Sequence, residues 1–545
     1  MKTKILSAVL LGSSLCFTSC NDFLDLSPTA AVSDKLVWSK VEYAELAINN
    51  YYHYINTYGA FSNGQSTAGL TEAYTDIFKY SSMTYNSLMY IPNEFAYGGS
   101  VLTASYVDTY LGMWTNGYTY VRRINEGLAN LKKYSDFSEE DMNRLEAEMR
   151  FFRGLIYFEL MKRYKEVIIY DEDMESVQKD TPLSTEKEGW DFIEEDMTFA
   201  GKNLPVSTSA NGRVTSGAAY ALLSRYMLYA ERWEVARKAA AEVLAMGYTL
   251  ETNYEDAFLS NNSEAILQYS YDRAGQAHSF DNYYSPAGDP GNGTIGGYGT
   301  PTQEMVESFE LATGGFPDWT PWHDEEGTTD TPPYEQLEPR FYATVLYNGA
   351  TWKGRTIEPF IGGADGWCTW KEDAVPAGRT TTGYYLRKLV DETHDFTEAA
   401  SGIQPWIHIR LAEVMLNYAE TCYQLGEISQ ANDALRSIRA RVDLPYTDKS
   451  GTELMAAIRQ ERKVELAYEG LYYWDMRRWG LAESAFTGNR VHGLKIVQNA
   501  NGSFTYSYVD CDLEDRHFPA KMYRLPLPTT ELNNNSSVEQ YPEWR

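Results

Sequence analysis

Apolar residues recur every three to four positions in two long stretches of the first third of the chain. Ile124, Leu128 and Leu131 follow this spacing in one stretch, and the run from Leu145 to Leu160 follows it in the next. Such spacing places the apolar side chains on one face of an α-helix. The pattern therefore predicts two adjacent amphipathic helices.

Two further segments, residues 215–248 and 408–442, have the pattern of a helical hairpin. They align with each other without gaps, and Ala236 then matches Ala431. Small residues where two helices cross, in a hairpin of about 34 residues, resemble tetratricopeptide repeats. Because the two hairpins lie far apart in the sequence, we expect a long insertion to interrupt the helical array.

The chain between these hairpins has a different pattern. It is rich in Gly and Pro, and short runs such as residues 341–348 (FYATVLYN) are typical of strands. Residues 60–100 form a second irregular segment. We therefore predict a mainly α-helical chain. Its expected helical parts are about 38–57, 104–250 and 406–485, with a last helix pair near 453–468 and 471–483, and its expected loop-rich insert is about 255–405.

The N-terminus has the pattern of a targeting segment. Lys2 and Lys4 precede an apolar run, residues 5–17, that is too short to span a bilayer. Small residues then lead directly to Cys20, as in a bacterial lipobox. We expect residues 1–19 to be a signal peptide that is removed and Cys20 to carry the lipid, so that the membrane is met through the anchor only. The alternative is a plain secretory signal followed by a chance cysteine.

Charge and cysteine content narrow the possible functions. The chain has 47 Lys and Arg against 76 Asp and Glu, a net charge of −29, which argues against a nucleic-acid partner. Beyond the N-terminal segment only Cys368, Cys422 and Cys511 remain, and they form neither a disulfide framework nor a Cys-x-x-Cys metal site. We expect Cys422 to be a buried thiol. No cofactor is expected, although bound Ca²⁺ stays open because acidic residues are abundant without a recognisable ligand spacing.

The common catalytic motifs are absent from the sequence. It contains no His-Glu-x-x-His, no Gly-x-Ser-x-Gly, no phosphate-binding Gly-x4-Gly-Lys and no EF-hand loop. We therefore expect a protein that is not an enzyme. A glycoside hydrolase stays as an alternative, because Asp318 and residues 324–326 (DEE) lie around Trp319 and Trp322.

Aromatic residues offer a different explanation for the loops. The chain has 43 Tyr, 21 Phe and 13 Trp. Sugar rings have an apolar face that stacks on aromatic rings, whereas their hydroxyl groups need polar partners. Residues 316–322 (FPDWTPW) hold two Trp in a Pro-stiffened loop, and residues 281–284 (DNYY) place rings beside an amide. This combination predicts carbohydrate-binding loops, whereas for Trp352, Trp367 and Trp370 we expect packing roles.

One segment near the C-terminus resembles a known family closely. Residues 458–480 (IRQERKVELAYEGLYYWDMRRWG) look like the signature helix pair of the SusD/RagB family of outer-membrane nutrient-binding lipoproteins. Other blocks resemble the family too: residues 20–29 (CNDFLDLSPT), 338–349 (EPRFYATVLYNG), 380–388 (TTTGYYLRK) and 523–535 (YRLPLPTTELNNN).

The resemblance implies an architecture, a location and a partner. It implies one SusD-like domain over residues 20–545, with four tetratricopeptide-like helical hairpins wrapped by a loop-rich subdomain. The protein would lie at the cell surface of a Gram-negative bacterium, anchored in the outer membrane. It would capture an oligosaccharide or polysaccharide by aromatic stacking and deliver it to a SusC-like TonB-dependent transporter. A RagB-like scaffold that binds peptides or proteins is the alternative.

The resemblance also suggests ligand-binding positions, because the family's aromatic arc comes from a loop after the first helix and from the central insert. The corresponding expected platforms are Tyr97, Tyr283, Tyr284, Trp319 and Trp322, with Asp76 and Asn282 as polar partners.

The signature itself indicates a structural role. Glu461, Glu465 and Glu469 recur every four residues and would repel one another on one helix face. We expect the nearby Arg462, Arg477 or Arg478 to lie across from them in a network that fixes the last helix pair. This network is not expected to be a catalytic site.

Overall fold

The computed structural model describes residues 33–59, 61, 70–80, 87–173, 180–208, 212–260, 262–292, 296–367 and 379–545. The predicted lipid attachment at Cys20, together with Cys368 and Trp370, lies outside the described residues.

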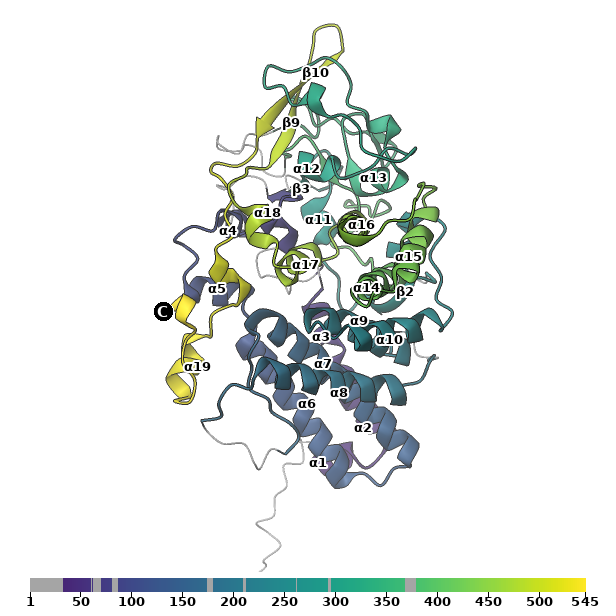
Figure 1. Ribbon diagram of the computed structural model, residues 1–545, viewed down its shortest axis with the longest axis vertical. Coiled ribbons are helices and arrows are strands. Elements are labelled where there is room, and N and C mark those ends of the chain that lie inside the picture. Colours follow the sequence, from purple (N-terminus) through teal and green to yellow (C-terminus); the bar gives the residue numbers. More distant parts are fainter. Residues whose placement is uncertain are drawn as a thin grey trace, which may run out of the picture.

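Stacked helices form one half of the molecule, the lower half in Figure 1. The predicted amphipathic pair is α6 (Trp114–Tyr134) and α7 (Glu139–Tyr164), which pack against each other. Helix α8 (Glu186–Asn203) packs on α7 and begins at a capping box, in which Thr185 Oγ1 accepts the Glu188 N–H and the Glu188 carboxylate accepts the Thr185 N–H. Apolar periodicity and capping thus agree on these helices.

The two predicted hairpins are present and lie side by side. The first is α9 (Ser216–Tyr229) with α10 (Trp233–Leu244), and the second is α14 (Leu411–Gln424) with α15 (Ile428–Ala440). Helix α10 packs directly against α14, although the whole loop-rich insert separates them in sequence. Ala236 and the aligned Ala431 are fully buried, as expected of small residues at helix crossings.

The array continues with α16 (Gly451–Glu465), which packs on α14, followed by α17 (Tyr472–Arg478) and α18 (Ala482–Phe486). Shorter helices complete the chain: α1 (Asp34–Val37), α2 (Val41–Ile48), α3 (His53–Thr57), α4 (Ser87–Tyr97), α5 (Ala104–Leu111), α11 (Phe280–Tyr284), α12 (Gln303–Val306), α13 (Pro339–Thr344) and α19 (Thr529–Asn534). The mainly α-helical class is confirmed.

The other half of the molecule carries short antiparallel strand pairs between long loops. The pairs are β1 (Phe78–Tyr80) with β3 (Gly299–Pro301), β2 (Ala265–Tyr269) with β8 (Trp406–Arg410), β4 (Val345–Leu346) with β7 (Tyr385–Leu386), β5 (Thr351–Trp352) with β6 (Arg355–Thr356), and β9 (His492–Gln498) with β10 (Phe504–Asp510). The β9–β10 hairpin stands at the end of the molecule opposite α1 (Figure 1).

Two predictions for the irregular segments need correction. Residues 341–348 were expected as a strand, but α13 covers the first part and only β4 is extended. Pro339 at the first helical position favours a helix start there, and Arg340 is held by buried carboxylates. Within residues 60–100, which were expected to be irregular, α4 forms a helix.

The predicted acidic network exists, but most of its partners come from elsewhere in the chain. Glu465 pairs with Arg410 at 2.7 Å, and Arg410 also pairs with Glu469 and with Glu264, each at 2.6 Å. Glu461 pairs with Arg340 and with Arg439. Glu469 lies beyond the end of α16, so the three acids do not share one helix.

The expected basic partners have other roles. Arg462 pairs with Asp475 at 2.9 Å, and Arg478 pairs with Asp475 and with Glu420. Sequence proximity suggested these arginines as partners of the acids. Arg462 on α16 and Arg478 on α17 instead meet acids on α14 and α17, and Arg477 donates to the Tyr523 carbonyl.

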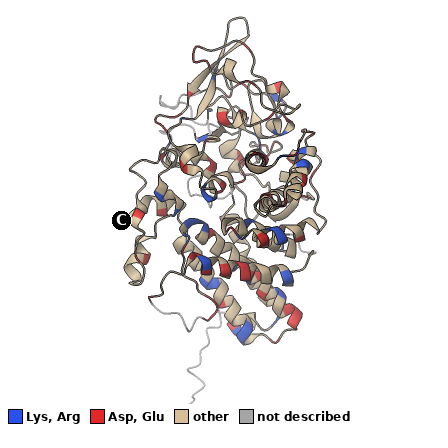
Figure 2. Cartoon of the chain, viewed as in Figure 1, with Lys and Arg blue, Asp and Glu red and all other residues tan. Residues whose placement is uncertain are grey.

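Charges of both signs are interspersed along the helices of the helical half (Figure 2). Cys422 and Cys511 are buried free thiols, which confirms the expectation for Cys422. None of the helices in the described ranges combines the length and the apolar character that crossing a membrane requires.

Candidate functional site

A cavity of about 450 Å³ lies in the loop-rich half, where the β9–β10 hairpin meets the loops around residues 325, 367 and 381. Its lining includes Glu325, Trp367, Thr381, His492, Tyr508 and Asp510. The volume is in the range of small-ligand sites in proteins, about 300–1,000 Å³.

The hairpin supplies one wall of this cavity. His492 lies opposite Asp510 in the strand register, and Tyr508 lies two residues from Asp510, so the three share one face of the hairpin. The His492 ring stacks on Tyr508 with the centroids 4.4 Å apart. The Tyr508 N–H donates to the carbonyl of Asp324 at 2.9 Å, which ties the acidic loop to this wall.

An ion pair holds the imidazole of the wall. His492 Nδ1 lies 2.6 Å from Glu304 Oε1, and the His492 N–H donates to the same carboxylate at 3.1 Å. Burial alone lowers the pKa of His492, but the hydrogen bond and charge of Glu304 raise it above its ordinary value. Burial also raises the pKa of Glu304, which His492 partly offsets. The pair therefore fixes the ring on which Tyr508 stacks.

Two polar groups at the cavity are buried without a partner. Trp367 Nε1 and Thr381 Oγ1 form no hydrogen bond within the part of the chain that the structure describes. The Trp367 side chain is half-buried and its neighbour in sequence, Gly366, packs against Phe360. A buried donor without a partner is rare and calls for a ligand or water. The cavity therefore combines an indole ring with a hydrogen-bond donor and a hydroxyl that are ready for a polar ligand.

Three of the predicted platforms are core residues instead. Tyr97, Tyr284 and Trp319 expose only 6%, 5% and 5% of their surface. The Tyr97 hydroxyl accepts the Leu513 N–H, the Tyr284 hydroxyl bonds the Tyr80 hydroxyl, and Trp319 packs edge-on against Trp322. The expectation that these rings are exposed is wrong, because the last residues of α4 and α11 and the loop that holds Trp319 turn their rings onto the core.

The other predicted residues are more accessible but occupied within the protein. Tyr283 stacks on Tyr298 at 4.8 Å, and Asn282 donates to Asn292 at 2.6 Å. Asp76 forms an ion pair with Lys463 at 2.9 Å.

Trp322 alone of the predicted set packs, within the described residues, in the same small cluster as Tyr508. Its Nε1 donates to the Asp330 carbonyl at 2.9 Å. Neither Trp319 nor Trp322 lines this cavity, and its two aromatic lining residues, Trp367 and Tyr508, were not among the predicted platforms.

Trp367 and Tyr508 escaped the sequence analysis for different reasons. Trp367 follows a Gly-rich stretch (residues 361–367, IGGADGW) and was expected to pack. Tyr508 stands in an alternating run, residues 504–510 (FTYSYVD), whose period of two could have identified a strand with one face toward a site. Trp352 is fully buried, as expected.

Within the described ranges, no group of three or more His, Cys, Asp or Glu side chains is arranged to hold a metal ion. The cavity is instead lined by aromatic rings, by the unbonded Trp367 N–H and by a few charged side chains, such as Glu325 and Asp510.

The fold combines a helical half with a loop-rich half, and comparison with known protein families shows to which family a chain with this fold belongs. The model described as "SusD family" matches residues 263–544, and the model described as "Starch-binding associating with outer membrane" matches residues 22–228. The chain belongs to the SusD family.

Relatives cover nearly the whole chain. A SusD-like protein of Bacteroides ovatus is 26% identical over 100% of this chain and 96% of its own length. A SusD-like protein of Bacteroides fragilis has a solved structure that is 29% identical, with a TM-score of 0.77, over 94% of this chain and 98% of that one. A laminarin-binding SusD-like protein shares the fold at 23% identity, with a TM-score of 0.64, over 92% of this chain and 99% of that one.

Proposed function

We propose that this protein binds a glycan at the cavity formed by Trp367, Thr381 and the β9–β10 hairpin. The observation that carries the proposal is the pair of buried, unpartnered polar groups, Trp367 Nε1 and Thr381 Oγ1, on a wall that also holds an aromatic ring. A sugar presents both an apolar ring face and hydroxyl groups, and this wall offers a partner to each.

The physical mechanism is stacking with hydrogen bonding. The Trp367 indole offers its face and its N–H, and Thr381 offers a hydroxyl. Tyr508 stacks on His492 at 4.4 Å and also contacts the tilted His323 ring at 4.6 Å, so these two rings fix its position before a ligand binds. Rings that are fixed before binding lose little conformational entropy when the ligand arrives.

The test is affinity electrophoresis of the lipid-free mature chain, residues 21–545, through gels that contain soluble polysaccharides, laminarin among them. We expect one glycan to retard the protein. Replacing Trp367→Ala should weaken binding by about 1–3 kcal/mol, which is roughly fivefold to 150-fold, as for the loss of one stacking ring elsewhere.

Phe316→Ala is the matched control, because this ring is 54% exposed but lines a different cavity, beside α15 and α16. It should bind as the unaltered protein does. Trp322→Ala tests the predicted loop directly and should have the smaller effect of the two Trp variants, since its Nε1 is already bonded. Equal retardation of the Trp367→Ala and unaltered proteins would contradict the site.

Two further assays of the purified protein distinguish the alternative functions. Release of reducing sugar by the purified protein would favour a glycoside hydrolase, for which Glu325 and Asp510 at the cavity are the acids to replace. If no glycan retards the protein but the protein binds peptides, the RagB-like scaffold would be favoured.

Delivery of the glycan to a SusC-like TonB-dependent transporter, from an outer-membrane anchor at Cys20, belongs to the same proposal. Its support is the lipobox pattern before Cys20, the family resemblance and the matched model's description of outer-membrane association. A lipid anchor keeps the protein beside its partner, so that weak glycan binding suffices for uptake.

The anchor is tested by growing the bacterium with radioactive palmitate. The unaltered protein should take up label and co-isolate with the transporter, whereas Cys20→Ser should be unlabelled and should leave the membrane fraction. Cys422→Ser controls for the thiol itself and should stay labelled, because that residue is buried. A labelled Cys20→Ser protein would refute the anchor.

A further inference from the structure

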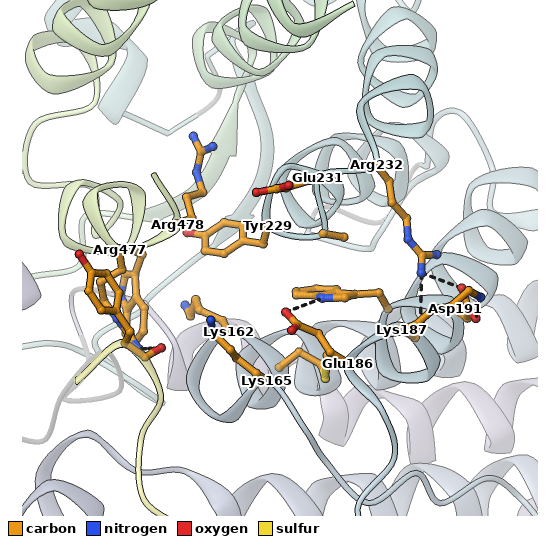
Figure 3. Close-up of a pocket in the computed structure, with 15 residues that line it drawn as sticks. Lys162, Lys165, Glu186, Lys187, Asp191, Tyr229, Glu231, Arg232, Arg477 and Arg478 are labelled. Carbon is orange, nitrogen blue, oxygen red and sulfur yellow. Dashed lines mark hydrogen bonds and ion pairs between the residues drawn. The ribbon is translucent and has the colours of Figure 1, made fainter. Parts of the chain in front are cut away.

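A second and larger cavity, of about 840 Å³, lies in the helical half of the molecule. It is enclosed by the C-terminal end of α7, the start of α8, the α9–α10 turn and α17 (Figure 3). Its aromatic lining is Trp190, Tyr229, Trp474 and Tyr523. It shares no lining residue with the cavity of the proposed function.

Cations gather at one end of this cavity. Lys162, Lys165, Arg477 and Arg478 come from α7 and α17, on a chain whose net charge is −29. In Figure 3, Arg477 and Lys162 lie at the end away from Arg232, which pairs with Asp191 at 2.7 Å. The lining also holds the acids Glu186 and Glu231, and Glu186 accepts the Trp190 Nε1–H. Within the described residues, none of the three lining acids bonds the Nε or Nη1 of Arg477.

Two of these cations have protein partners. Lys162 pairs with Glu159 at 2.8 Å, and Arg478 pairs with Asp475 at 2.7 Å.

Arg477 differs from both. It is only 7% exposed, and its Nη2 donates to the Tyr523 carbonyl at 3.1 Å, whereas its Nε and Nη1 have no hydrogen-bond partner within the described residues.

The burial of Arg477 makes its unbonded N–H groups unfavourable for the stability of the fold. Its guanidinium lies over the Trp474 ring at 4.5 Å, which holds it in place but satisfies none of its N–H groups. A buried arginine is ordinarily paired, because leaving its charge without a partner costs free energy. A planar, two-oxygen anion fits an edge of a guanidinium that offers two N–H groups, and in Arg477 each such edge combines Nη2 with Nε or with Nη1. Nη2 has a second N–H besides the one that Tyr523 accepts, so an edge of Arg477, here called its free edge, can still take such an anion.

We propose that this cavity binds an acidic sugar residue, whose anionic group pairs with the free edge of Arg477 and with Lys165 and whose ring lies against the aromatic lining. The aromatic rings favour a sugar over a bare anion, and the volume accommodates a short oligosaccharide. The site is distinct from the cavity of the proposed function; only the carbohydrate part of the ligand rests on that proposal. The anionic group could be a carboxylate or a sulfate ester, which the experiment distinguishes.

The test is isothermal titration calorimetry of the lipid-free mature chain with three probes. They are a galacturonic acid trisaccharide, its fully methyl-esterified form and a sulfated galactose trisaccharide. We expect the esterified form to bind at least tenfold more weakly than the acid. Tighter binding of the acid would identify a carboxylate site, and tighter binding of the sulfated sugar a sulfate site. Added salt should weaken either one.

Variants connect the binding to the site. Arg477→Gln should weaken the charged trisaccharide at least tenfold, and Lys165→Gln, at an exposed position, severalfold. Lys238→Gln removes an exposed cation of α10 outside the cavity and should bind as the unaltered protein does. If circular dichroism shows that Arg477→Gln does not fold, Lys165→Gln decides.

Three results would overturn the inference: equal affinity for the acid and its ester, unchanged binding by the folded Arg477→Gln variant, or binding of hexaglutamate in place of any sugar. The neutral glycans of the gel assay separate this from the proposed function. Arg477→Gln should retain their binding and Trp367→Ala should lose it, so either proposal can fail alone.

Discussion

Glu72 is a buried carboxyl group with half of its hydrogen bonding unmet. It is fully buried, its Oε1 accepts the Gly470 N–H at 2.6 Å, and its Oε2 has no partner within the described residues. Burial raises its pKa to about 7, and the nearby charge of Glu469 adds to the effect. Glu72 joins the segment before β1 to Gly470, in the middle of the signature segment of residues 458–480, so its ionisation bears on the stability of the fold.

The sign of the pH dependence follows from this raised pKa. Below pH 4.5 the group is neutral in both the folded and the unfolded chain, and above pH 7 it is charged in both, but only the folded chain then holds a buried charge. Glu72→Gln keeps the acceptor for Gly470 and removes the charge. We therefore expect the variant to gain stability relative to the unaltered protein between pH 5 and pH 8, approaching about 3 kcal/mol.

Urea unfolding at pH 5, 6, 7 and 8 measures this gain. Glu539→Gln, whose side chain is 82% exposed, controls for the loss of one negative charge and should show no such trend. A constant difference between the Glu72→Gln and unaltered proteins across this range would contradict the raised pKa.

At the scale of elements, one arginine connects parts of the chain that are far apart in sequence. Arg410 ends β8 and is fully buried among Glu264 beside β2, Glu465 of α16 and Glu469 beyond α16. Removing one member of a buried charge cluster leaves the others without compensation, which is more costly than the cluster's net contribution to stability.

Arg410→Met should therefore destabilise the protein by about 3–5 kcal/mol, because it leaves carboxylates buried. Arg436→Met is the matched control, since Arg436 forms ion pairs on the surface of α15 with a side chain that is 46% exposed, and its loss should change little. Urea midpoints of the two variants test the difference. Similar midpoints would mean that the buried network does not hold these elements.

Predictability from the sequence also differs between kinds of element. Helices α6, α10 and α15 follow from apolar periodicity, because each has a buried face and an exposed one. Helices α7, α9 and α14 were also predicted, although α7 and α9 are buried on nearly all sides. The loop-rich half did not follow, since its residues are placed by contacts between distant segments. Trp319 illustrates this: its Pro-stiffened loop suggested exposure, but the ring packs against Trp322 and Tyr334.

The sequence predicted the type of ligand site but not the residues that line the candidate cavity. Abundant aromatic rings beside polar residues indicated carbohydrate binding, and the family resemblance indicated the fold. Trp367 could not be identified, because its role comes from an unpartnered Nε1 that only the packing of neighbouring loops creates. Arg477 was expected to pair with the acids of the signature, whereas two of its nitrogens have no hydrogen-bond partner within the described residues.

At the scale of the whole molecule, the two halves have separate cavities of different character. The loop-rich cavity holds a ring and two unpartnered polar groups, whereas the helical cavity is cationic at one end. A protein with both would discriminate among glycans by charge as well as by shape. The two sets of variants proposed above measure these contributions independently.

The contact between α10 and α14 has a consequence for how the chain reaches its native state. Helix α10 is made early, but the helix that covers it follows only after the entire loop-rich insert. Closing so large a loop is slow, and until it closes, the part of α10 that packs against α14 rather than α9 is open to solvent. Each newly made chain therefore passes through a period in which it can aggregate, and the yield of folded protein depends on how quickly the last third of the chain folds onto the first.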